Sequence, residues 1–255
     1  MGRGSVLVLV EGEREQKFFE KLGSLLPEKT EMTLVPFRCN IYSLYKEMEE
    51  YDFDIDVEKA IELSKRVSPE EKEKIKGRAF EAKYLLFDLD LHADSLTEEK
   101  RLQAIPKLLE VFDDDSDNGL LFLNYPMFES VREKHDYDGK GPIPTFPFRN
   151  GTKYKKEMGE RGIPLDPRNL TFHKYCLFLK DSLLISNAIL GNPYRMPTKE
   201  EAEKINSQTL WEKEKELIDK EQKVYCLNTS VQILLAYFGF QRIKEWIEEA
   251  EKSNE

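Results

Sequence analysis

Short apolar runs alternate with amphipathic segments in the first half of the chain, and this pattern limits the fold more than any other feature. Ser5–Val10 is rich in valine and carries no charge, as expected for a strand that is buried on both faces of a sheet. Gly12 interrupts the run, and the large apolar residues of Glu13–Leu26 then recur at helical spacing. Strands that alternate with helices predict a mostly parallel sheet with helices on its faces.

The alternation continues and predicts an α/β domain over residues 1–130. The run Ser68-Pro69-Glu70-Glu71 is a capping box with proline at the first helical position, so a short helix begins there. The acidic run Asp113–Asp117 is interpreted as a solvated helix end. Further strands are expected at Met32–Phe37, Tyr84–Phe87 and Gly119–Asn124, and further helices at Asp56–Arg66 and Thr97–Phe112.

Residues 131–255 predict a mainly helical C-terminal region that contacts substrate or a partner. We expect no strand in it, and Tyr137–Pro167 has the composition of a long loop. Gly191 is expected to end one helix, and Gly239 to separate two others. The expected helices cover Leu170–Leu190, the stretch from a capping box at Thr198 to about Glu221, Thr229–Phe238 and Gln241–Glu251.

The net charge of −10 conceals a basic segment. Between Arg132 and Lys180, basic residues outnumber acidic ones and are interleaved with aromatic residues and prolines. This combination suits charge neutralisation along a nucleic-acid backbone and stacking on bases. A solvated charged loop explains the same composition equally well. The candidate nucleic-acid contacts are Arg149, Lys153, Lys155 and Lys156.

Cysteine usage and hydropathy predict a cytoplasmic protein that has no contact with a membrane. The three cysteines lack C-x-x-C spacing, which argues against a disulfide framework or a zinc cluster and fits a reducing cytosol. Val6–Val10 is too short for the core of a secretory signal. The uncharged stretch Val224–Gln241 contains several polar residues, so we interpret it as helix-packing core, with a dimer or partner contact as the alternative.

Acidic or polar residues follow three of the four predicted strands. Glu11 follows the first strand, Asp88 and Asp90 follow the third, and Asn124 ends the fourth. In parallel α/β sheets, ligands and chemistry gather at the carboxyl ends of the strands. Side chains at i and i+2 of an extended segment point to the same side, so Asp88 and Asp90 can share one site.

Carboxylates without a basic neighbour repel each other unless a cation lies among them. Oxygen ligands of this kind suit Mg²⁺ or Mn²⁺, which can activate water and stabilise the leaving oxygen at a phosphodiester. We therefore expect Glu11, Asp88 and Asp90 to bind the metal, and Glu15 to be a further catalytic carboxylate.

Two more residues are candidates for an additional part of this site. Glu129 lies shortly after the fourth strand, and His92 lies two residues after Asp90. Each candidate also has a structural interpretation. Asp-x-Asp is often only the start of a loop, His92 would then be an ordinary loop residue, and Glu15 would be an acidic first-turn residue favoured by the helix dipole.

The segments Val8–Glu15 and Leu85–Asp90 resemble the Toprim domain, the metal-dependent catalytic module of topoisomerases, primases and nucleases of the OLD type. That family has a glutamate after its first strand and an Asp-x-Asp motif after a later one, and Glu11 matches the first of these. Nuclease members have a second acidic residue within the following helix, which Glu15 matches. The resemblance covers roughly residues 5–130.

The resemblance implies a Toprim-like sheet and a metal-dependent endonuclease. The chain contains no G-x-x-x-x-G-K-[ST] motif, so no P-loop ATPase is fused to this domain. The segment Asn124–Ser130, followed by a helical half, is similar to the stand-alone Toprim effectors of PARIS-type anti-phage systems. RloB-like proteins are the next most similar group. This implies a toxic effector that cleaves RNA, with tRNA as the leading target, or DNA. It also implies a separate ATPase subunit as partner and a homodimer as the active form.

Two other functions remain open on the sequence. Phe87–Asp90 has the strand and Asp-x-Asp of haloacid-dehalogenase-type phosphatases, although Leu91 and His92 replace the small residues that usually follow. A non-catalytic Toprim module that binds nucleic acid or a partner is the second alternative. The intact Glu11, Asp88 and Asp90 argue against it.

Overall fold

The computed structural model describes residues 4–26, 30–90, 96–133, 140 and 142–252. The chain forms two compact units. The first unit comprises Met1–Asp88 and Ala93–Phe122, and the second comprises Leu89–His92 and Leu123–Glu255. Each unit is described separately below.

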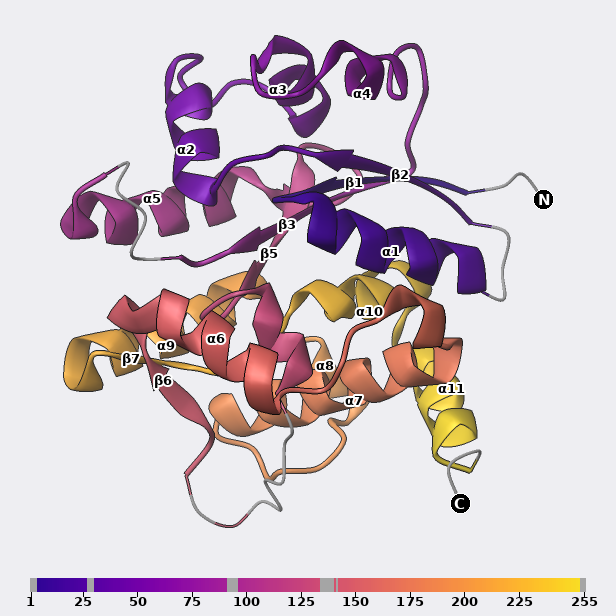
Figure 1. The fold of residues 1–255 in the computed structure, drawn as a ribbon, viewed down its shortest axis with the longest axis vertical. Helices are drawn as coiled ribbons and strands as arrows, with labels where there is room; N and C mark the ends of the chain where they lie inside the picture. The colour runs from indigo at the N-terminus through magenta and orange to yellow at the C-terminus, as the bar shows by residue number, and fades with distance from the viewer. Residues whose placement is uncertain (1–3, 27–29, 91–95, 134–139, 141, 253–255) are drawn as a thin grey trace. The chain divides into compact units, whose positions relative to one another are not determined.

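The first unit is built on a five-stranded sheet with the order β2-β1-β3-β5-β4 (Figure 1). The inner strand β1 pairs in parallel with β2 and β3, and the short β4 at the edge is antiparallel to its neighbour β5. The strands are β1 (Ser5–Val10), β2 (Glu31–Pro36), β3 (Ala82–Asp88), β4 (Asp113–Asp114) and β5 (Gly119–Asn124), whose last two residues belong to the second unit.

Helices flank this sheet, and α1 lies on the opposite side of the strands from α2, α3 and α4 (Figure 1). The helices are α1 (Glu13–Leu25), α2 (Ile41–Glu49), α3 (Val57–Leu63), α4 (Pro69–Glu73) and α5 (Glu98–Val111). Side-chain oxygens of Asp56, Ser68 and Thr97 accept hydrogen bonds from the first turns of α3, α4 and α5. These caps confirm the helix starts that the sequence predicts.

Burial explains why β1 is an inner strand of the sheet and not an edge strand. Val6–Val10 is buried throughout, with Val10 opposite Pro36 on one side and Leu86 on the other. A charged side chain within this run would lose its hydration, which accounts for the absence of charge between Gly4 and Glu11 in the sequence. The predicted mostly parallel sheet with flanking helices is therefore confirmed.

The second unit is mainly helical, as predicted, and the long helix α7 packs against α11 (Figure 1). Its longer helices are α6 (Gly151–Arg161), α7 (Phe172–Ile189), α8 (Lys199–Ala202), α9 (Ser207–Glu221), α10 (Ile233–Phe238) and α11 (Phe240–Lys252). Short 3₁₀ turns lie at Phe128–Arg132, Phe148–Asn150, Pro167–Asn169 and Ser230–Gln232. Gly191 and Gly239 have positive φ angles of 87° and 77°, which explains why glycine ends α7 and α10.

Three sequence predictions in this half are wrong. The region contains strands, because β6 (Thr145–Pro147) pairs with β7 (Lys223–Tyr225). Tyr137–Pro167 is not a long loop, since it includes both β6 and α6. The helix that starts at the Thr198 capping box ends at Ala202, and Asn206 caps a separate helix, α9. Strands of three residues are too short for an alternation of apolar and polar residues to be recognised.

A fourth correction concerns Asp113–Asp117. Asp113 and Asp114 form β4 opposite Leu120 and Gly119, so the run is an edge strand and turn rather than a helix end. By contrast, the core interpretation of Val224–Gln241 is confirmed for its first part, since most apolar residues from Val224 to Leu234 are buried, whereas those after Leu234 are partly or fully exposed. Within the described residues, no helix combines the length and apolar character that a membrane crossing requires.

Candidate active site

Glu11 and Asp88 lie at the carboxyl ends of two neighbouring strands of the first unit. Because β1 and β3 are parallel and Val10 lies opposite Leu86, the residues that follow each strand emerge at the same edge. The backbone N–H of Glu11 donates to Leu86 O at 3.2 Å. In return, the N–H of Asp88 donates to Oε2 of Glu11 at 3.1 Å. The parallel register thus places the two acidic residues beside each other.

Glu15 lies at the start of α1, next to the same strand end. A Cβ atom added to Gly12 would lie 3.1 Å from Oε2 of Glu15, so the missing side chain of Gly12 leaves room for this carboxylate. Glu15 is only 9% exposed. Its position in the first turn places a negative charge near the positive end of the helix dipole. The structure thus places Glu15 beside Gly12, which directly follows Glu11.

Cys39 adds a thiol close to this acidic pair. Burial raises its pKa to about 12, and the charges of Glu47 and Glu11 act in the same direction, whereas Arg66 and a hydrogen bond with Ser43 act against it. The thiol is therefore protonated at neutral pH and is a poor nucleophile.

Asp90 belongs to the second unit. Leu89 N donates to Asn124 O at 3.1 Å, and Asp90 N donates to Pro126 O at 3.4 Å. Asp90 has a φ of 33°, so the backbone leaves the extended conformation after Asp88. The expectation that Asp88 and Asp90 point to the same side assumed an extended segment, and the structure does not have one there. Aspartate tolerates this left-handed region better than most residues.

Asn124 is fully buried and holds the second unit together. Its Oδ1 accepts hydrogen bonds from the N–H of Ser230 at 3.2 Å and from Oγ of Ser230 at 2.9 Å. This residue, which ends the fourth predicted strand, therefore anchors the segment that precedes α10.

Replacing Asn124 by alanine is expected to lower the free energy of unfolding of the second unit by about 2 kcal/mol, because two buried donors lose their acceptor. Urea denaturation followed by tryptophan fluorescence measures this, since both tryptophans, Trp211 and Trp246, lie in the second unit. Asn169→Ala, at an exposed position, is the matched control. An Asn124→Ala protein as stable as this control would contradict the assigned role.

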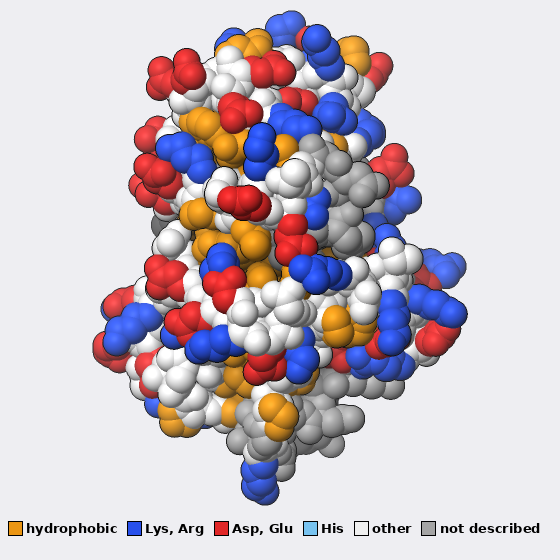
Figure 2. Space-filling model, turned by 90° about the vertical axis from the view of Figure 1, so that its left-hand side faces the viewer, with side chains coloured by type: hydrophobic (Ala, Val, Ile, Leu, Met, Phe, Trp, Pro, Cys, Tyr) orange, Lys and Arg blue, Asp and Glu red, His pale blue; other side chains and the backbone are white. Residues whose placement is uncertain are grey.

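The four candidate nucleic-acid contacts lie on or next to α6. Tyr154 and Met158 form the buried face of this helix, so Lys153, Lys155 and Lys156 lie on its exposed face. Lys155 Nζ is 3.7 Å from Oε1 of the buried Glu129, and the guanidinium of Arg149 lies over the ring of Phe148. Figure 2 shows basic and acidic side chains intermixed on the face that it presents.

Glu129 therefore has Lys155 as an ion-pair partner. It is 3% exposed, and its position after the fourth strand places it in the 3₁₀ turn Phe128–Arg132. His92, the other additional candidate, lies outside the described residues.

The described residues can be searched for side chains that could ligate a metal ion. In the part of the chain that the structure describes, no three or more His, Cys, Asp or Glu side chains form a group that could hold a metal ion. Glu11 and Asp88 are two acidic residues joined by the hydrogen bond from the Asp88 backbone N–H to the Glu11 carboxylate. Because Mg²⁺ is commonly held by one or two carboxylates together with water and substrate phosphates, this pair provides the minimum set of protein ligands.

A buried polar network in the second unit was not predicted from the sequence. The Tyr154 hydroxyl donates to Oε2 of Glu133 at 2.9 Å, and Arg161 pairs with the other carboxylate oxygen. Burial raises the pKa of Tyr154 well above its ordinary value, and burial likewise raises the pKa of Cys226. Both groups therefore stay protonated. The sequence shows that the segment from Arg132 to Lys180 is basic, but it does not show that Arg161 pairs with the buried Glu133.

Glu214 is a second buried acid that sequence reasoning missed. It is fully buried in α9, and its Oε2 accepts the N–H of Tyr225 at 3.0 Å. Burial raises its pKa well above the ordinary value. Its hydrogen bond with Tyr225 ties β7 to α9. In the sequence it is one of several glutamates in a charged helix, with nothing to distinguish it.

Comparisons with protein-family models, with curated proteins and with solved structures found no match to this chain.

Proposed function

We propose that this protein is a metal-dependent endonuclease of the Toprim type, which hydrolyses phosphodiester bonds in RNA or DNA. The observation that carries the proposal is the Glu11–Asp88 pair at the carboxyl ends of β1 and β3, joined by the 3.1 Å hydrogen bond from Asp88 N to Oε2 of Glu11. In parallel α/β sheets this edge is where ligands bind. The order of the acidic residues along the chain agrees with the Toprim resemblance.

Glu11 and Asp88, which both belong to the first unit, would hold a Mg²⁺ or Mn²⁺ ion. When bound, such an ion activates water and stabilises the leaving oxygen of a phosphodiester. Within the chain itself, the Asp88 N–H fixes the orientation of the Glu11 carboxylate. Glu15, held beside Gly12, is the carboxylate that we assign to accept the proton from the attacking water.

The exposed face of α6 supplies positive charge for substrate contact. Lys153, Lys155 and Lys156 lie on this face and would neutralise backbone phosphates. Lys155 contributes less in this proposal, because it also lies near the Glu129 carboxylate.

Charge reversal on α6 tests this assignment. Lys153→Glu with Lys156→Glu is expected to weaken nucleic-acid binding and to reduce the salt dependence of the binding constant by about one unit of slope per lost phosphate contact. Filter binding at several salt concentrations measures both. The double variant Lys204→Glu, Lys220→Glu carries the same charge change at exposed positions elsewhere in the second unit. Equal behaviour of the two double variants would make α6 an ordinary solvated helix.

The biological setting rests on the resemblance alone. We propose a cytoplasmic effector of bacterial anti-phage defence, with tRNA as the leading target, a separate ATPase subunit as partner and a homodimer as the active form. In the apolar stretch Val224–Gln241, the residues available to a dimer are those after Leu234, because most apolar side chains from Val224 to Leu234 are buried within the second unit. Growth arrest on expression of the chain alone, relieved by a coexpressed ATPase subunit, would support this setting.

The primary experiment incubates the purified protein with end-labelled tRNA, single-stranded DNA and duplex DNA. Cleavage is expected with Mg²⁺ or Mn²⁺ and is expected to stop in excess EDTA. Full activity in EDTA would contradict the metal requirement. Binding without cleavage under all metal conditions would favour the non-catalytic module, and hydrolysis of only a small phosphomonoester would favour the phosphatase.

A further inference from the structure

A pocket of about 440 Å³ opens in the first unit between the end of α2 and the residues of α3 and its following loop. Its volume lies in the range of pockets that bind small ligands. None of the predicted site residues lines it. It therefore requires an explanation of its own.

The apolar side of the pocket is exposed to solvent. Tyr51 and Leu63 are 40% and 37% exposed, and they are the large hydrophobic side chains that the described residues leave exposed. Both line this pocket, together with Ile55 and Ala60. Exposed apolar side chains that gather in one hollow are typical of a binding site rather than of ordinary surface.

The charged side of the pocket contains both a cation and a carboxylate that are available to a ligand. Arg66 and Glu47 pair with each other at 3.2 Å. Lys65 and Glu50 also line the pocket, and neither has an ion pair within the described ranges. A ligand that fills the pocket would thus meet a flat aromatic ring, one or two cations and one carboxylate.

The pocket and the acidic pair belong to the same compact unit. The backbone N–H of Arg38 donates to Glu11 O at 2.9 Å, and α2 begins three residues later at Ile41. The pocket lies at the other end of this helix, where Glu47, Glu50 and Tyr51 line it. Helix α2 therefore connects the Glu11 strand end to the pocket.

We propose that this pocket binds one nucleotide of the nucleic-acid substrate, with guanine as the preferred base. The base stacks on Tyr51, its adjacent N1–H and N2–H groups donate to the Glu50 carboxylate, and its phosphate lies against Lys65 and Arg66. The proposal rests on the proposed nuclease function, for which it names a base-recognition subsite in the same unit as the acidic pair.

Calorimetric titration of the full chain with single nucleotides in EDTA tests the pocket. GMP is expected to bind more tightly than AMP, CMP or UMP, and about tenfold more tightly than guanosine, which lacks the phosphate. Tyr51→Ala is expected to weaken GMP binding about tenfold or more, the loss of one stacking contact. Glu50→Gln is expected to abolish the preference for GMP over AMP.

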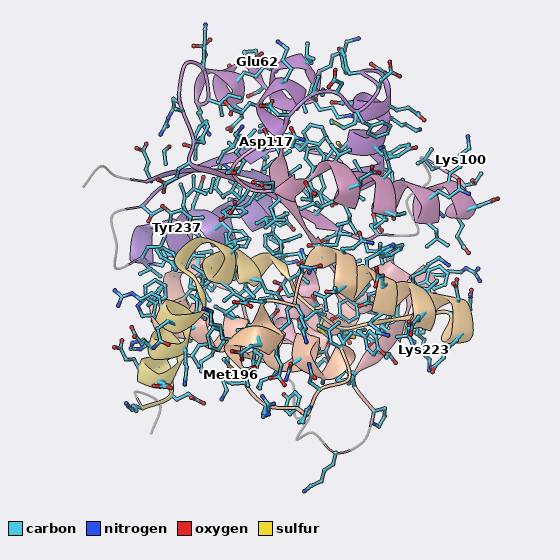
Figure 3. The ribbon with its side chains drawn as sticks, turned by 180° about the vertical axis from the view of Figure 1, so that it is seen from behind. Glu62, Lys100, Asp117, Met196, Lys223 and Tyr237 are labelled. Carbon is cyan, nitrogen blue, oxygen red and sulfur yellow. The ribbon has the colours of Figure 1, made fainter. Side chains whose placement is uncertain are left out.

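Lys65→Ala separates the phosphate contact from the rest. It is expected to weaken GMP binding about fivefold and to leave guanosine binding unchanged. Lys100→Ala removes a lysine that extends from α5 into solvent, where Figure 3 labels it, and is expected to change neither affinity. Circular dichroism of each variant confirms that the fold is retained.

Three results would overturn the inference. The first is no detectable binding of any nucleotide at about 5 mM, a concentration that would reveal even millimolar affinity. The second is GMP binding that Tyr51→Ala and Lys65→Ala leave unchanged. The third is binding of a tyrosine-containing dipeptide that is as tight as that of GMP. Because the titration uses no metal and no cleavage, GMP binding without nuclease activity would leave the pocket assigned and refute only the proposed function.

Discussion

Glu11→Gln is expected to reduce metal-dependent cleavage of nucleic acid by about 10²–10³-fold, a loss typical of removing one preorganised electrostatic contact at a reacting phosphate or carbonyl. Glutamine keeps an oxygen that can accept the Asp88 N–H, so the strand ends retain their hydrogen bond. It removes the negative charge that attracts the cation. The expected phenotype is therefore a folded protein that binds nucleic acid but does not cut it.

The matched control for this prediction is Glu13→Gln. Glu13 lies in the first turn of the same helix as Glu15, two residues from Glu11, but its side chain is exposed. Cleavage rates of both variants are compared over a range of Mg²⁺ concentrations. Raising the metal concentration should recover part of the Glu11→Gln activity if that carboxylate contributes to metal affinity. Equal activity of Glu11→Gln and Glu13→Gln would remove Glu11 from the active site.

The parallel sheet could be predicted because its strands carry their signal in consecutive residues. In β1 and β3, side chains on both faces are buried, and the apolar runs Val6–Val10 and Tyr84–Phe87 are each followed directly by an acidic residue. The proximity of Glu11 and Asp88 follows from parallel pairing alone. The hydrogen bond from Asp88 N to the Glu11 carboxylate could not be predicted in this way, because it depends on the conformation of the Glu11 side chain.

The remaining features depend on contacts between distant parts of the chain. β6 exists because Phe146 lies opposite Val224, far along the chain, and neither three-residue strand shows a pattern by itself. The φ of 33° at Asp90 follows from backbone contacts with Pro126, whereas the sequence alone suggests a continued extended segment. The pocket beside α2 combines residues from two helices and a loop, and none of them belongs to a recognisable motif.

Asp181→Asn is expected to stabilise the second unit at pH 8 by up to about 3 kcal/mol. Burial raises the pKa of Asp181 in α7 to about 6, against the smaller opposing effect of Lys180. Asp181 and Glu133 line one small cavity of this unit, and Glu133 is paired with Arg161. The ionised Asp181 carboxylate is therefore poorly compensated, and asparagine removes its charge at nearly constant volume.

The pH dependence distinguishes this mechanism from a general packing effect. In the unfolded chain an aspartate titrates near pH 3.9, about two units below the folded value. Below about pH 4 the Asp181 carboxyl group is protonated in both the folded and the unfolded state, so no buried charge lowers the free energy of unfolding. Between about pH 4 and 6 the unfolded state releases the proton first, so wild-type stability falls as the pH rises, and above about pH 6 the full penalty remains.

The difference in unfolding free energy between Asp181→Asn and the wild type should therefore grow from near zero at pH 4 to its maximum above pH 6. Urea denaturation followed by tryptophan fluorescence measures it, because Trp211 and Trp246 are both buried in the second unit. Other titrating groups affect both proteins equally and cancel in the difference. Asp219→Asn, at an exposed position of α9, should change stability by no more than about 1 kcal/mol. A constant difference across this pH range would show that the Asp181 charge is not the cause.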